Sequence, residues 1–122
     1  MDAKTYLNQA KHADRQVRAL HERRKYCLEL ENDLGDQMPP SLKRLNVKLA
    51  QRVDAWAKLT IEIETVIDAV EDEFCREVLR YRYLNGLNWK TIASMTHYSY
   101  EWLYKTHAKG LRMVDRILGM RE

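Results

Sequence analysis

Apolar side chains recur every three or four positions along most of the chain, which is the spacing of one buried face of an α-helix. From Asp2 to about Leu34 small or apolar residues keep this spacing, with interruptions at Arg24 and Glu31. A second stretch keeps it up to residue 70, after Ser41, which is expected to cap it. The pattern predicts two long amphipathic helices.

The link between these stretches is short and rich in residues that end helices. It contains Gly35 and the pair Pro39-Pro40, which disfavour or interrupt helical backbone hydrogen bonding. Two helices so joined are expected to fold back as an antiparallel hairpin, because neither can bury its apolar stripe alone. The same spacing also fits a coiled coil between two chains. A monomer and a homodimer through this half are therefore both open.

Beyond residue 70 the predicted helices are shorter. Asp72 is expected to cap a helix that ends before Asn85-Gly86, Asn88 to cap a helix from Trp89 to about Met95, and Ser99 to cap a last helix. A short helix, a tight connection and a capped helix form the arrangement of a helix-turn-helix, whose second helix enters the DNA major groove.

The expected fold is all-α. It divides into a helical hairpin over residues 1–70, which is also the candidate dimerisation element, and a helix-turn-helix DNA-binding domain over residues 71–122. In the second part, Ile92 and Leu103 are expected to fill a small core, and Ala93 marks where the two helices of the motif approach each other.

Composition supports a helical chain without a membrane segment. The sequence is 45% hydrophobic and 32% charged, with four Gly and two Pro, which argues against disorder and a turn-rich β protein. No apolar run exceeds three residues, so we expect neither a membrane span nor a secretory signal, and a cytoplasmic protein. The isolated Cys27 and Cys75 are interpreted as small buried groups.

Charge is distributed unevenly. The formal net charge is +3, but the segment from residue 76 to residue 116 has eight basic residues against three acidic ones, a local charge of +5. The basic residues are Arg76, Arg80, Arg82, Lys90, Lys105, Lys109, Arg112 and Arg116. This asymmetry points to the C-terminal third as the electrostatically active part, with a solvated basic face as the alternative.

Nothing in the sequence indicates catalysis. The glycines form no phosphate-binding loop. His12, His21, His97 and His107 are scattered, without the spacing of metal ligands. We expect neither an enzyme nor a bound metal or cofactor.

The segment from Arg76 to Ala93 reads REVLRYRYLNGLNWKTIA and resembles the start of region four of bacterial sigma factors. The stretch from Tyr98 to Leu111 continues that resemblance in register. Together with Tyr6-Leu7-Asn8-Gln9 and Asp14-Arg15 near the N-terminus, it also resembles the small ArpU/RinA-type phage transcriptional regulators. The second resemblance spans nearly the whole chain.

The resemblance implies a phage or prophage protein that regulates transcription, typically of late genes, by binding promoter DNA in the bacterial host cell. Contact with RNA polymerase is a further implication. Matched position by position, the resemblance places Tyr100, Glu101, Tyr104 and Lys105 where sigma-like proteins face base edges and phosphates. A carboxylate such as that of Glu101 can accept a hydrogen bond from cytosine N4.

Other residues complete the candidate DNA interface. Lys90 and Thr91 begin the first motif helix, and Lys109 and Arg112 follow on later turns of the second, whereas Arg116 is expected to lie too far along it. The full candidate set is Lys90, Thr91, Ser99, Tyr100, Glu101, Tyr104, Lys105, Lys109 and Arg112. His107 is interpreted as part of the recognition helix, and Trp102 as a packing residue rather than a DNA contact.

Two positions depart from the sigma pattern. His97 replaces the usual turn glycine, where a positive φ would cost strain. Thr96 stands where a packed leucine is usual, so Met95 or Tyr98 must complete the local core. Two other functions fit the same elements: a small terminase-like DNA-packaging protein, and a helical protein–protein interaction module that does not bind DNA.

Overall fold

The computed structural model describes residues 1–121, and every regular element in this range is helical. The helices are α1 (Ala3–Leu34), α2 (Pro40–Asp68), α3 (Glu73–Leu79), α4 (Trp89–Thr96) and α5 (Tyr100–Met120), with a 3₁₀ turn η1 (Gly35–Gln37) after α1 and a π-helical turn η2 (Arg80–Leu84) after α3. The all-α prediction and the two long N-terminal helices are thus confirmed. None of the helices in this range has the length and hydropathy needed to cross a bilayer.

The chain divides into two compact units, and the division cuts through α1 and α2. Residues 12–60 form one unit, here called the hairpin unit. Residues 1–11 and the chain from Ile61 onwards form the other, here called the discontinuous unit. The packing therefore does not divide the chain at residue 70, where the sequence pattern had placed the boundary, because the first turns of α1 and the end of α2 pack with the later helices.

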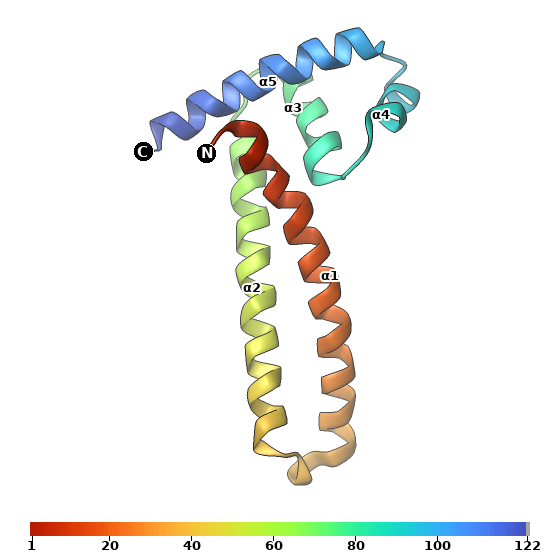
Figure 1. Cartoon of the computed structure of the whole chain (residues 1–122), viewed down its shortest axis with the longest axis vertical. Coiled ribbons are helices and arrows are strands. Elements are labelled where there is room, and N and C mark those ends of the chain that lie inside the picture. The colour runs from red at the N-terminus through yellow and green to blue at the C-terminus, as the bar shows by residue number, and fades with distance from the viewer. Residues whose placement is uncertain (122) are drawn as a thin grey trace. The chain divides into compact units, whose positions relative to one another are not determined.

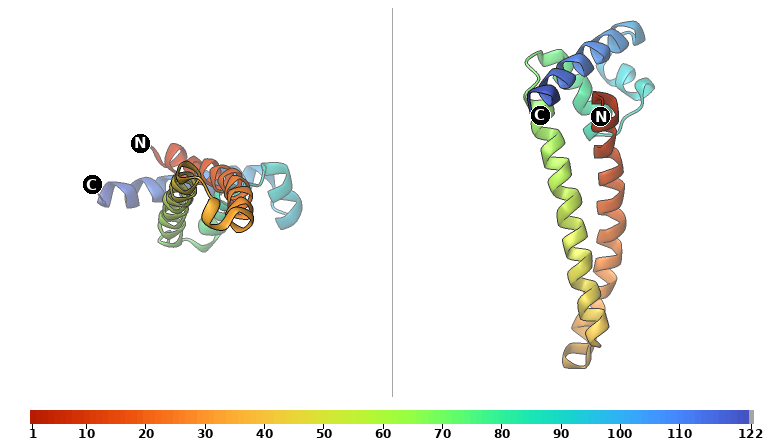
Figure 2. Two further views of the ribbon diagram at one scale, coloured as in Figure 1. Left: turned by 90° about the horizontal axis from the view of Figure 1, so that it is seen from below. Right: turned by 60° about the vertical axis from the view of Figure 1, so that its left-hand side comes forward.

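In the hairpin unit, α1 and α2 run antiparallel and side by side (Figures 1 and 2). Their common core consists of the buried Leu20, Cys27 and Leu49. Partly buried side chains of α2 surround it: Leu42, Leu45, Val53 and Trp56. The predicted apolar stripes therefore meet each other within one chain, and Cys27 is a buried free cysteine as expected.

The loop of the hairpin uses glycine and proline for distinct purposes. Gly35 has φ +51°, a left-handed conformation that side chains disfavour. α2 begins at Pro40, one residue before Ser41, the predicted cap. The reason is that proline fits the first turn of a helix, where its missing N–H has no partner in any case. The Pro39 carbonyl accepts the first backbone bonds, from Leu42 and Lys43 at 3.0 and 3.2 Å.

Polar contacts in the discontinuous unit tie the start of the chain to α5. The Ala3 amide donates to Asp115 Oδ1 at 2.8 Å. Arg121 donates to Glu62 at 2.7 Å, and the Tyr6 hydroxyl donates to the same carboxylate at 3.2 Å. These hydrogen bonds, that from Arg121 foremost, hold the pKa of Glu62 below its usual range. The first helical turns are thus part of the unit that contains α3, α4 and α5.

The close packing of α3 against α5 depends on a glycine. Gly110 is buried in the middle of α5, and a Cβ atom there would lie 3.2 Å from Cδ1 and 3.3 Å from Cγ of Leu79. Leu79 is itself fully buried. The absence of a side chain at Gly110 thus makes room for Leu79 of α3.

Because residues 1–11 complete the discontinuous unit, Leu7→Ala should destabilise that unit. Leu7 is 0% exposed, so truncation should lower the free energy of unfolding by roughly 2–5 kcal/mol. Hydrogen exchange of the α5 amides, more than 90 residues away in sequence, should accelerate. Asn8→Ala, at an exposed neighbouring position, is the matched control and should change little. Unaltered α5 protection in Leu7→Ala would contradict the discontinuous unit.

Candidate nucleic-acid interface

The helices of the C-terminal half begin at caps formed by nearby side chains. Asp72 Oδ1 accepts from the Cys75 amide at 3.0 Å, Asn88 Oδ1 from Thr91 at 2.8 Å, and Ser99 Oγ from Trp102 at 3.1 Å. Each cap satisfies one backbone N–H that the helix leaves unpaired. All three caps predicted for this half of the chain are confirmed.

The helix that precedes α4 changes form along its length. It is α-helical over Glu73–Leu79 and π-helical over Arg80–Leu84, where a single regular helix had been expected. Asn85 ends it with a backbone bond to Arg80, and Gly86 follows with φ +67°. The predicted stop at Asn85-Gly86 is confirmed, and the π turn is a correction.

The connection between α4 and α5 turns at His97. This residue has φ 61° and ψ 16°, the left-handed conformation that usually favours glycine. Thr96, its neighbour, directs its hydroxyl to the Ile92 carbonyl at 2.7 Å and accepts from the Tyr98 amide at 3.3 Å. The positive φ considered for His97 is therefore present, and Thr96 stabilises the turn through polar contacts instead of packing as a leucine would.

A small core joins α3, α4 and α5. Its buried members are Val78, Ile92 and Leu103, one from each helix. Partly buried side chains enclose it: Tyr81, Leu87, Trp89, Ala93, Tyr98 and Trp102. Of the two residues expected to compensate for Thr96, Tyr98 joins this core, whereas Met95 is 52% exposed. Trp102 packs against Tyr98 and Phe74, with ring centroids at 4.2 and 5.7 Å, in accordance with a packing role.

Every residue of the predicted DNA-contact set is exposed, and the set lies on two helices and the connection between them. Lys90 and Thr91 lie in the first turn of α4, and Ser99 is occupied as the cap of α5. Tyr100 and Tyr104 are stacked on each other, one turn apart, with ring centroids at 6.2 Å. Glu101 forms an ion pair with Lys105 at 3.0 Å.

Four exposed basic side chains form a stripe along the outer face of α5. They are Lys105, Lys109, Arg112 and Arg116, at successive spacings of four, three and four residues. At 1.5 Å per residue the stripe extends over roughly 16 Å. It lies opposite the face that buries Leu103, Gly110 and Val114. One side of α5 is thus packed against the unit and the other presents positive charge.

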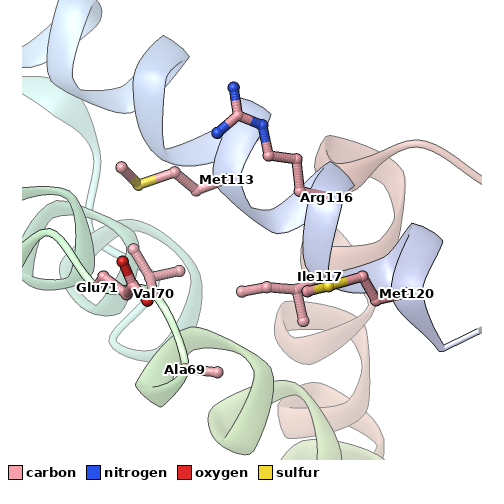
Figure 3. Close-up of a pocket in the computed structure, with 7 residues that line it drawn as sticks. All are labelled: Ala69, Val70, Glu71, Met113, Arg116, Ile117 and Met120. Atoms are coloured by element: carbon pink, nitrogen blue, oxygen red, sulfur yellow. The ribbon is translucent and has the colours of Figure 1, made fainter.

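Arg116, which is expected to lie too far along the helix to contact DNA, is on the same face of α5 as the other three basic residues. It borders a groove of about 240 Å³ between α5 and the turn that follows α2. Figure 3 shows Ile117 extending toward Ala69 and Val70, whereas the guanidinium group of Arg116 extends away from them. Because α5 is unbroken to Met120, Arg116 continues the spacing that Lys105 begins.

Three other basic residues of the segment are engaged within the fold. Arg76 donates to the Val70 carbonyl at 2.8 Å, and Arg82 donates to the Leu87 carbonyl at 3.0 Å. Arg82 also lies over the Trp89 ring, 5.1 Å from its centroid. Arg80 forms an ion pair with Asp68. The local charge of +5 therefore overstates what this part of the chain offers to a partner.

Lys109 has a partner as well, the helix cap Asp72, at 2.9 Å. The hydrogen bond from Lys109 and that from the Cys75 amide lower the pKa of Asp72 to about 2. The same carboxylate raises the pKa of Lys109. Lys109 is thus exposed on the outer face of α5 and at the same time paired with Asp72. Lys90 and Arg112, in contrast, have no ion pair or hydrogen-bond partner among residues 1–121.

His107 lies on the inner side of α5 and not on its outer face. Its Nε2 atom is 2.7 Å from the Tyr83 hydroxyl, and its ring packs edge-on against Trp89 with centroids at 4.8 Å. Burial, with a contribution from the charges of Arg82 and Lys4, lowers the pKa of His107 to about 4. His107 thus lies within α5, but its side chain faces the interior of the unit and is not available at the outer face.

Within residues 1–121 no group of three or more His, Cys, Asp or Glu side chains is arranged to hold a metal ion. No family model, curated protein or solved structure matches the chain. The exposed face of α4 and α5 therefore has to be interpreted from its own geometry and charge.

The partly buried imidazole of His107 should make stability depend on pH. Its folded-state pKa of about 4 lies below the usual value of 6.5. The unfolded chain therefore binds a proton that the folded chain does not, and the free energy of unfolding should fall as the pH drops from about 6.5 to 4. Below that pH both states are protonated and this contribution no longer changes.

Urea titrations at several pH values test this expectation. His107→Gln should remove this part of the pH dependence, whereas Tyr83→Phe, which keeps the imidazole and deletes only the hydroxyl, should retain most of it. An equal slope of stability against pH in the wild type and His107→Gln between pH 4 and 6.5 would contradict the assignment.

Proposed function

We propose that the chain binds double-stranded DNA in a sequence-specific manner through α4 and α5, as a transcriptional regulator of phage or prophage type acting on late-gene promoters. The observation that carries the proposal is the basic stripe on the face of α5 that the fold leaves uncovered. Lysine and arginine side chains at helical spacing suit a DNA backbone, whose phosphates supply most of the affinity.

In this proposal α4 and α5 act as a helix-turn-helix. The first turns of α5 enter the major groove, where Tyr100, Glu101 and Tyr104 reach base edges or thymine methyl groups. Lys90 and Thr91, at the amino end of α4, approach the phosphate backbone. Lys105, Lys109, Arg112 and Arg116 follow phosphates along the groove. The exposure of these side chains and the small core behind them support this arrangement.

A single helix-turn-helix has a small contact area. Such modules bury on the order of 600 to 1,000 Å² of protein surface, which limits affinity and specificity. A second copy of the chain, or contact with the host RNA polymerase at the promoter, would add the remaining binding energy. Both partners belong to the proposal, as does action in the cytoplasm of a bacterial host.

Binding to DNA should be sensitive to salt and to the basic stripe. The protein should retard the electrophoretic mobility of DNA fragments from the genomic neighbourhood of its coding sequence, even in the presence of competitor DNA of shuffled sequence. Between roughly 50 and 200 mM salt the affinity should fall by orders of magnitude. Arg112→Ala should weaken binding to all sequences and reduce the slope of log K against log salt by about 0.9.

Arg23→Ala, on an exposed part of the hairpin unit, is the matched control for Arg112→Ala and should leave the salt slope unchanged. Binding that is insensitive to salt, or absent for every duplex, would falsify the DNA proposal and favour a protein-interaction module. Ring-sized assemblies with sequence-independent binding would favour a DNA-packaging protein.

Glu101 should determine specificity at one base pair. Glu101→Ala is expected to cost about 1 to 3 kcal/mol on the specific site and to relax the preference for cytosine at that position, because the acceptor for its N4 amine is lost. The measurement is competition binding against a set of single-base variants. Glu73→Ala, in the exposed first turn of α3, serves as the control. Equal weakening on random DNA would argue against base recognition by Glu101.

A further inference from the structure

The hairpin unit has an apolar groove on its surface, outside the core formed by Leu20, Cys27 and Leu49. Side chains of α1 and α2 line the groove, which has a volume of about 350 Å³. Leu28 on α1 is 41% exposed and Val47 on α2 is 57% exposed, and Ala50 of α2 also lines the groove. Each helix thus presents an apolar side chain to solvent at the same place.

A polar side chain within this groove lacks part of its hydrogen bonding. Asn46 Nδ2 donates to Glu31 at 3.0 Å, but Asn46 Oδ1 is buried without a hydrogen-bond partner among residues 1–121. Leaving an acceptor unpaired is unfavourable. An asparagine in the apolar seam between helices is a known means of fixing register and the number of chains at the expense of stability. Asn46 is suited to that role.

The charges beside the groove are of both signs: Lys43 lines it from α2, and a pair of opposite charges lines it from α1. Arg24 and Glu31 line it and lie seven residues apart on α1, with Leu28 close to their midpoint. If a second copy of α1 crosses in the opposite direction about a twofold axis near Leu28, each Arg24 faces Glu31 of the second copy. Such reciprocal pairing is the property of an isologous interface. A uniformly charged ligand such as DNA would meet one unfavourable charge.

We propose that this groove is the interface between two copies of the chain, in which Leu28 packs on Leu28 of the second copy and Val47 is covered. The two hairpin units then form a four-helix assembly, a packing in which helices meet through apolar stripes flanked by charges. The inference concerns the hairpin unit alone and does not rest on the proposed DNA binding, although a twofold dimer would suit a palindromic site.

Sedimentation equilibrium of the full chain at micromolar concentrations tests the dimer. The wild type should sediment as a dimer, and Val47→Lys as a monomer with unchanged helix content. Ile61→Lys, at an apolar position of α2 that is 62% exposed and lies outside the groove, should remain dimeric. A monomeric wild type, or a Val47→Lys protein that dimerises as well as Ile61→Lys, would overturn the proposal.

Charge reversal tests the symmetry. Arg24→Glu and Glu31→Arg should each weaken self-association about tenfold, because two attractive pairs become repulsive. A mixture of the two variants should form heterodimers, in which both pairs are attractive again. Asn46→Leu should strengthen association or admit larger oligomers. Failure of the mixture to associate better than either variant alone would overturn the twofold arrangement.

The outcomes separate this inference from the proposed function. A monomer that still binds its DNA fragment overturns the dimer alone. A dimer that binds no duplex supports the dimer and removes the DNA proposal.

Discussion

The burial of one face of α5 is the constraint on which the rest of the discontinuous unit depends. Leu103 and Val114 are fully buried on that face, and Gly110 lets Leu79 of α3 approach. Because a helix has a fixed periodicity, burying these positions determines which residues remain outside. The basic stripe is a direct consequence, since its members lie about half a turn away from the buried ones.

The same constraint explains why the start of the chain belongs with its end. The core shared by α3, α4 and α5 has only three buried members, and small cores are marginal. Residues 1–11 and the end of α2 add Leu7, Ile63 and Ile67, all of which are fully buried. The hydrogen bond from Ala3 to Asp115 then connects α1 with α5, and that from Arg121 to Glu62 connects the residue after α5 with α2. The unit is thus stabilised by contacts between residues near the two ends of the sequence.

Several basic side chains of this unit are paired within the fold and are not free to contact a partner. Arg76, Arg80 and Arg82 bind carbonyls or a carboxylate of neighbouring elements, and Lys109 stabilises the capping residue Asp72. Lys90, Arg112 and Arg116 are exposed and carry the positive charge of the outer faces of α4 and α5. The positive surface is therefore smaller than the net charge of the segment suggests. The position of a basic residue on α5 decides its availability to a partner more than the number of basic residues does.

The sequence by itself determined the features that depend on neighbours in the chain. The apolar spacing predicted the long helices, and Asp72, Asn88 and Ser99 predicted the starts of the later ones, because each cap binds an amide three residues ahead. Ile92 and Leu103, which were expected to fill a small core, are both buried in it, and Val78 of α3 is its third buried member.

Three features were visible only in the tertiary structure. Residues 1–11 pack with the later helices, the side chain of His107 faces the interior of the unit, and the arginines have partners within the fold. Each of these results from contacts between residues far apart in the sequence, or from a choice between two sides of a helix. Local spacing cannot determine such contacts, because they depend on which surfaces the whole chain brings together.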